Sequence, residues 1–206
     1  MAETLWGTYK LNDPIVKGHE VLTPAHYEEV RLSISGNTAI VGDLLVYDSI
    51  AAGSVGVTTP ATWRDVRLAV ALSSDAHAAD EFMGWHGQLI KPSVIPDPVS
   101  GVDWTPDTAL VDAQNVVMLK RGAFGVVTKM IMTDLSENII TGIGCSVSAT
   151  AGEIKKTVNA FTDTTPTLAE AIAALLSQVQ EFVGHADVCT EDPGGAMGVD
   201  VMWGST

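Results

Sequence analysis

Short apolar runs that alternate with polar residues, separated by clusters of turn-forming residues, limit the fold more than any other feature of this chain. Alternation places Val30, Leu32 and Ile34 on one face of a strand predicted at residues 29–34. Further strands are predicted at residues 38–47, 66–72, 89–95, 116–119, 125–132, 139–147 and 198–203. Because short strands at this spacing form closed or face-packed sheets, the pattern predicts a mainly β protein, either a β-barrel or a β-sandwich.

One segment, residues 165–184, has helical periodicity instead. Thr165 is placed to cap a helix, Pro166 suits its first position and Gly184 suits its end, which predicts an accessory C-terminal helix over about 166–183. Its large apolar residues form one continuous stripe: Leu168, Ile172, Leu175, Leu176, Val179, Phe182 and Val183. Such a stripe either covers the sheet of its own domain, which is the more common arrangement, or packs against another subunit.

Prolines mark a second irregular feature. Pro92 interrupts the strand predicted at 89–95, which favours an edge strand because proline cannot donate to a central ladder. Residues 92–112 contain four prolines and are predicted to form a long loop that reaches toward a neighbouring molecule.

The first predicted strand begins at residue 29. We expect an N-terminal arm at residues 1–28 and a single β-rich domain at 29–206 that includes the loop and the helix.

The charge balance excludes some classes of partner. The 206 residues include 11 basic and 25 acidic side chains, giving a net charge of -14, and 46% of the residues are hydrophobic. A strongly acidic surface repels nucleic acid and anionic membranes, so we expect neither as a partner. No signal peptide is visible at the N-terminus and the apolar runs are too short for a membrane span, which predicts a soluble protein. Cys145 and Cys189 are too few for a disulfide framework and are predicted to be free thiols.

The glycines in Gly142-Ile143-Gly144 follow a predicted strand, where nucleotide phosphates are often bound. A dinucleotide-binding loop needs a third glycine three residues later, and Val147 occupies that position. The sequence also contains no Gly-Lys-Ser or Gly-Lys-Thr triplet, and the residues after Gly144 alternate as a strand does. We expect no cofactor here, only a bend, a bulge or a close backbone approach.

Nucleophilic catalysis has little support. The segment 144–148 lacks the closing glycine of a Gly-x-Ser-x-Gly elbow, and no neighbouring residue would activate Cys145. The sequence therefore predicts that the protein is not an enzyme and has no catalytic residues.

Possible metal ligands gather in one stretch. Asp75, His77, Asp80 and Glu81 lie close together, with His86 nearby, so a small β-barrel enzyme or a metal-binding module using Asp75–His86 is an alternative function. The same stretch fits an acidic turn between two strands equally well, and no metal site is predicted. His185 and Cys189 have no second ligand pair, and the aspartates of the proline-rich loop lack the spacing of a calcium loop.

Tryptophans are the best candidates for contacts with another protein. All five lie near turns, a terminus or the irregular loop, where they either complete the core or anchor an interface. The predicted interface residues are Leu5, Trp6 and Tyr9 in the arm and Trp104 in the loop.

Several short motifs recur along the chain: Val41-Gly42-Asp43, the Leu68–Leu72 strand with the acidic turn to Glu81, Met83-Gly84-Trp85-His86-Gly87, the Gly142-to-Gly152 segment, and the terminal Val-x-Val-x-Trp strand. Together these motifs resemble the small β-barrel decoration, or cement, proteins of tailed-bacteriophage capsids. The resemblance covers residues 30–155 and the last six residues. The helix and the proline-rich loop have no counterpart in a minimal member of that family.

The resemblance implies a structural virion protein that binds the outer capsid surface and bridges capsid subunits. Its partners would be the major capsid protein and further copies of itself, with a trimer favoured. It would be made in the host cytoplasm and reside on the virion, without catalytic residues or cofactors. Another phage structural part, such as a tail-tube or connector subunit, is the remaining alternative.

Overall fold

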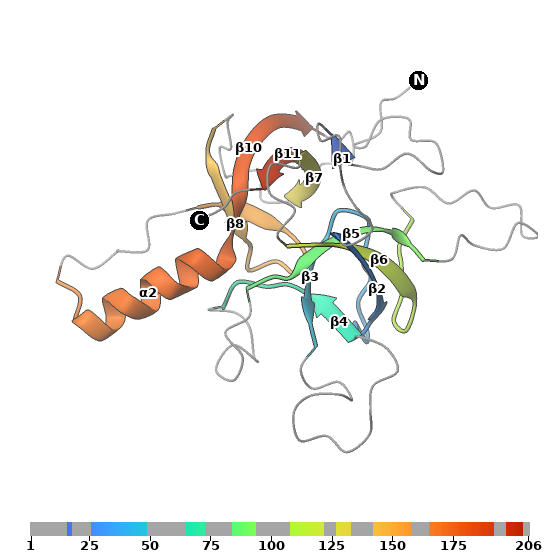
Figure 1. Ribbon diagram of the computed structural model, residues 1–206, viewed down its shortest axis with the longest axis horizontal. Coiled ribbons are helices and arrows are strands. Elements are labelled where there is room, and N and C mark those ends of the chain that lie inside the picture. Colours follow the sequence, from blue (N-terminus) through green and yellow to red (C-terminus); the bar gives the residue numbers. More distant parts are fainter. Residues whose placement is uncertain are drawn as a thin grey trace, which may run out of the picture.

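The structure is a computed structural model that describes residues 16–17, 26–48, 65–72, 84–93, 108–121, 127–132, 142–157, 165–191 and 197–203. Two β-sheets and one projecting helix make up the described part (Figure 1). The elements are β1 (Val16–Lys17), β2 (Tyr27–Leu32), β3 (Leu44–Tyr47), β4 (Asp65–Leu68), β5 (Gly87–Pro92), β6 (Asn115–Lys120), β7 (Val127–Met132), β8 (Gly144–Val147), β9 (Ile154–Lys156), α2 (Leu168–Glu181), β10 (Phe182–Glu191) and β11 (Met197–Trp203).

The first sheet is a closed barrel in the order β2-β4-β3-β5-β6, which confirms the predicted mainly β fold. β2 and β4 are parallel and the other neighbours are antiparallel. The prediction of an edge strand around Pro92 is wrong, because β5 pairs with both β3 and β6. Pro92 is the last residue of β5, where the missing N–H group interrupts no further ladder bonds.

The second sheet has the order β1-β7-β11-β10-β8-β9 and is antiparallel throughout. β10 was missing from the predicted strands because its first residues, Phe182 to Gly184, continue the apolar pattern of the helix. Buried side chains of both sheets form one continuous hydrophobic cluster, from Val30 and Leu89 in the barrel to Val147 and Val183 in the second sheet. The two sheets therefore share a core.

The turn between β8 and β9 connects the second sheet to the barrel. The Gly152 N–H donates to the carbonyl of Ala69 (2.8 Å), and the Gly152 carbonyl accepts from the N–H of Leu44 (2.8 Å). Gly152 has φ +82°, and a Cβ there would lie 2.8 Å from the carboxylate of Asp43. Only glycine combines this backbone conformation with so close an approach.

Gly142 and Gly144 bend the chain into β8. Gly142 has φ +87° and its N–H donates to the carbonyl of Ala186, while Gly144 pairs with His185 across to β10. The register of this pair shifts between Phe182 and Gly184, so the irregularity lies on β10. The segment is a turn leading into a paired strand.

α2 is shorter than the predicted helix at both ends. Thr167, not Thr165, is the N-cap, and it forms a capping box in which its side chain and that of Glu170 bond each other's backbone N–H groups. The helix ends at Glu181, and Gly184 lies inside β10, opposite Cys145 and Trp203. Among the described residues no helix is long and apolar enough to cross a membrane.

Candidate functional site

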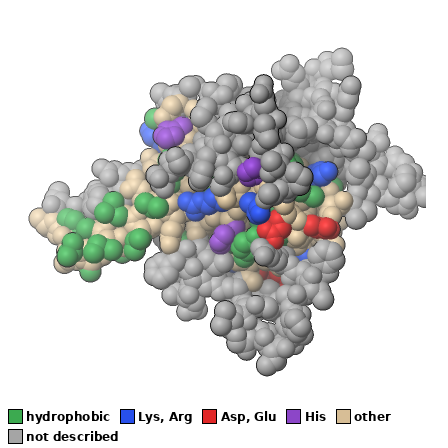
Figure 2. Space-filling view, viewed as in Figure 1, with side chains coloured by type: hydrophobic (Ala, Val, Ile, Leu, Met, Phe, Trp, Pro, Cys, Tyr) green, Lys and Arg blue, Asp and Glu red, His purple; other side chains and the backbone are tan. Residues whose placement is uncertain are grey.

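The apolar face of α2 points away from the rest of the protein. The helix extends outward from the junction of β8 and β10 (Figure 1), and its surface carries a patch of hydrophobic side chains (Figure 2). The patch, here called the α2 stripe, has the following exposed fractions: Leu168 78%, Ile172 50%, Leu175 48%, Leu176 46% and Val179 47%. The expectation that this stripe covers the protein's own sheet is therefore wrong.

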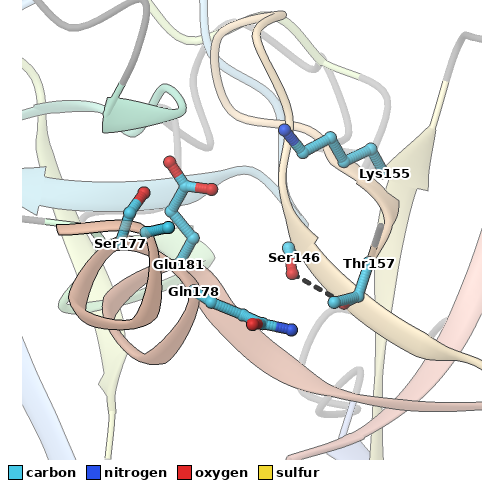
Figure 3. Close-up of a pocket in the computed structure, with 7 residues that line it drawn as sticks. Ser146, Lys155, Thr157, Ser177, Gln178 and Glu181 are labelled. Atoms are coloured by element: carbon cyan, nitrogen blue, oxygen red, sulfur yellow. Dashed lines mark hydrogen bonds between the residues drawn. The ribbon is translucent and has the colours of Figure 1, made fainter. Parts of the chain in front are cut away.

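The face of α2 that turns toward its own body carries small and polar side chains instead. Ala174, Ser177, Gln178 and Glu181 line a cavity of about 190 Å³ together with Ser146, Lys155 and Thr157 of the β8–β9 hairpin (Figure 3). Ser146 and Thr157 bond to each other through their hydroxyls at 2.6 Å. Because ligand pockets usually have volumes of about 300 Å³ or more, this cavity is small for a binding site.

Arg121, directly after β6, holds the C-terminal end of α2. Its Nη1 donates to the carbonyl of Gln180 (2.9 Å) and its Nη2 to that of Val179 (3.0 Å). The guanidinium carbon lies 5.1 Å from the centre of the Trp85 ring. A cation at the last turn satisfies free carbonyls and opposes the negative end of the helix dipole.

Three further contacts fix the same end of the helix. The buried Trp85 donates its Nε1–H to the carbonyl of Phe182 (3.0 Å), and the Glu181 carboxylate accepts from the N–H of Leu72 (2.6 Å). Gly84 lies so close that a Cβ there would be 2.1 Å from the carbonyl oxygen of Gln180. α2 is thus clamped at its base and free along its stripe.

Removing the guanidinium tests this clamp. We expect Arg121→Ala to lower the free energy of unfolding by about 2 kcal/mol, because two charge-assisted bonds and one cation–π contact are lost. Urea unfolding followed by circular dichroism measures the change. Arg121→Lys keeps the charge without the two-pronged geometry and should lie between the wild type and the alanine variant. Equal stability of the wild type and Arg121→Ala would contradict the clamp.

Two ionisable groups with shifted pKa values lie at the barrel, the buried Asp43 and the half-buried His86. Burial raises the pKa of Asp43 to about 7, an effect opposed by the bond from the Ile40 N–H and reinforced by the charge of Glu153. Burial lowers the pKa of His86 to about 4, with help from the nearby charges of Arg121 and Arg67. The Nδ1 of His86 accepts from the N–H of Tyr47 (3.4 Å), and its ring lies 4.7 Å from the Tyr47 ring. These groups belong to the structural interior.

The structure places few of the predicted site residues. Residues 75–83 of the candidate metal-binding stretch 75–86 lie outside the described residues, as do Leu5, Trp6, Tyr9 and Trp104. His86 is half-buried against Tyr47, and Cys145 is a buried thiol on β8 that is not part of a disulfide. Within the described ranges, no three His, Cys, Asp or Glu side chains come close enough to hold a metal ion.

Sequence reasoning missed the residues that clamp α2. Gly84 belongs to a motif that supports only the family resemblance, Trp85 stands among five tryptophans with a general role in the core or an interface, and Arg121 has no local pattern to distinguish it. Comparison with protein-family models, curated proteins and solved structures found no match.

Proposed function

We propose that the protein is a structural virion protein that binds the outer surface of a tailed-phage capsid and stabilises the shell by bridging capsid subunits. The observation that carries the proposal is the α2 stripe: a clamped helix presents large apolar side chains outward, while its inner face carries small and polar ones. A helix built in this way serves contact with another macromolecule. The resemblance to capsid cement proteins supplies the partners: the major capsid protein, and further copies of the chain, one of which would occupy the stripe.

The remaining properties of the chain suit this role. The five-stranded sheet is closed, so it presents no free strand edge that would aggregate when many copies crowd on a shell. A net charge of -14 keeps the body soluble and suits the outside of a container for nucleic acid. We further propose that the protein carries no catalytic site or cofactor and that it is made in the host cytoplasm before it joins the virion.

Binding to capsid shells tests the proposal. Purified protein is mixed with expanded shells of the virus that encodes it, and the shells are sedimented. We expect saturable binding at a fixed ratio to capsomers and a higher melting temperature of the decorated shell. Absence of binding would refute the proposal, and assembly of the pure protein into tubes or rings would favour a tail-tube or connector subunit.

The predicted arm contact adds a residue-level test. We expect Trp6→Ala to reduce the affinity for shells roughly tenfold or more, because hot-spot tryptophans contribute about 2 kcal/mol or more to an interface and about 1.4 kcal/mol is a factor of ten. Trp6→Phe, which keeps an aromatic ring, should retain most of the binding. Circular dichroism should show the same fold for both variants. Normal occupancy by Trp6→Ala would exclude the arm from the interface.

A further inference from the structure

The α2 stripe has the spacing of a coiled-coil seam. Leu168, Ile172, Leu175 and Val179 are separated by four, three and four residues, which places leucines at d positions and β-branched residues at a positions. All four side chains are at least 47% exposed. In parallel coiled coils, β-branched residues at a with leucine at d favour two strands.

We propose that α2 is a self-association surface, through which two copies of the chain pair with their α2 helices parallel and in register. The proposal goes beyond capsid binding and does not depend on it. It names a second copy of this chain as the occupant of the stripe, which makes a dimer, and not the trimer that the family resemblance implies, the expected assembly through α2.

The exposed area of the stripe is large enough for a specific interface between two copies. Its five large side chains expose on the order of 500 Å² on each copy, near the upper end for the largest apolar patch of a monomer. Pairing two stripes would bury about 1,000 Å² in total, which is the lower bound for a specific interface. A weak to moderate dimer is therefore expected, strengthened wherever copies are held close together.

The charge distribution favours self-association through the stripe over self-association through the rest of the surface. Two copies, each with a net charge of -14, repel each other over most of their surface. Between Glu170 and Glu181 the helix carries no charged side chain, and Glu181 is buried against the body. The stripe thus lies on an uncharged segment, where like-charged molecules can approach closely.

The helix is also formed before it meets a partner. Two heptads are too short for a stable coiled coil between free peptides, since isolated helices of this length are marginal in water. Here Thr167 and Glu170 cap the first turn, and Arg121 holds the last carbonyls. Pairing therefore requires little further ordering of the backbone.

The body leaves the stripe accessible. Ala174, Gln178 and Glu181 turn toward the β8–β9 hairpin, whereas the stripe lies about a third of a turn around the helix from them. Because the clamp is at the C-terminal end, a parallel pair would place both bodies at that end and the two free N-terminal ends together.

Self-association is measured on the full chain, without capsids, by sedimentation equilibrium over a concentration series. We expect a reversible monomer–dimer equilibrium for the wild type. Leu175→Glu should weaken the dimer at least about a hundredfold, because pairing would bury two facing charges. Ala173→Glu adds the same charge on another exposed face of α2 and should leave the equilibrium unchanged. Circular dichroism should show the same fold for all three proteins.

The parallel orientation of the two α2 helices is tested by introducing one cysteine into the helix. In a parallel pair the two copies of residue 168 face each other at a d position, within the distance that a disulfide spans. In a chain with Cys189 replaced by serine, Leu168→Cys should therefore form a covalent dimer on mild oxidation, while the same chain with Leu168, whose remaining Cys145 is buried, should not.

Three results would overturn the proposal: a wild type that stays monomeric at all concentrations, a dimer that Leu175→Glu does not weaken, or a trimer in place of the dimer. Failure of Leu168→Cys to cross-link within an intact dimer would overturn the parallel arrangement. Because no shell is present, these outcomes are separate from those of the capsid-binding test. A variant that no longer self-associates but still binds shells would show that capsid binding does not require the pairing of α2 helices.

Discussion

Replacing Gly84 by alanine is expected to destabilise the protein by about 3 kcal/mol or more, the upper range for overpacking a buried position. The added Cβ would lie 2.1 Å from the Gln180 carbonyl oxygen and 2.6 Å from its carbon, so the backbone of α2 would have to move. Arg121 and Trp85 hold the same turn of the helix and resist that movement. Thermal and urea unfolding measure the loss.

Gly144→Ala provides a matched control. A Cβ on Gly144 would come no closer than 3.3 Å to another atom, which small side-chain shifts of Thr157 and Phe182 can accommodate. We expect this variant to lose about 1 kcal/mol or less, the usual cost of a tight contact with flexible groups. Similar stabilities for the two alanine variants would show that the contact between Gly84 and α2 is not rigid.

The second large effect concerns pH. Asp43, with its pKa raised to about 7, binds more protons in the folded than in the unfolded protein between about pH 4 and 7, so its contribution to stability is lost as the pH rises through 7. His86, with its pKa lowered to about 4, binds fewer protons when folded, so its contribution is lost as the pH falls from 6.5 to 4. These two opposite effects nearly cancel between about pH 4 and 6.5. We therefore expect the free energy of unfolding of the wild type to change little with pH in this range.

Substituting Asp43 or His86 should reveal the pH dependence of stability that the remaining residue causes. Asp43→Asn keeps an oxygen for the Ile40 N–H and removes the buried charge, so at pH 8 it should exceed the wild type by on the order of 3 kcal/mol. Its stability should then fall as the pH drops from 6.5 to 4. His86→Gln should show the reverse, a loss of stability as the pH rises from 4 to 7. Urea unfolding at a series of pH values separates these profiles, and parallel curves for all three proteins would refute the compensation.

The fold class could be predicted because it depends on local pattern. Alternation of Val30, Leu32 and Ile34 identified β2, and the apolar segments at 116–119 and 198–203 identified β6 and β11. The choice between barrel and sandwich depends on how strands pair across long stretches of chain, such as β2 with β6, which no local pattern records. The same limit explains the error at Pro92, where the position within the strand decides whether proline disturbs the sheet.

The candidate site could be predicted only in part. The stripe on α2 was visible as helical spacing, but its outward orientation depends on contacts made at the other end of the helix by Gly84, Trp85 and Arg121. The end of the helix was misplaced because Phe182 and Val183 fit both the helical pattern and a strand. Pairing with β8 and β11 decides between them, and that pairing is a tertiary effect.

Because α2 passes directly into β10, the number of residues in the helix determines the direction in which the stripe points. Glu181 ends the helix and Phe182 begins the strand, so no linker absorbs an added or lost residue. An insertion within the helix, between Leu176 and Val179, would rotate the stripe residues that precede it by about 100° around the helix axis and displace them by about 1.5 Å. A single inserted residue would thus aim the same side chains at a different neighbour, whereas substitutions on the stripe change only how strongly the present neighbour is held.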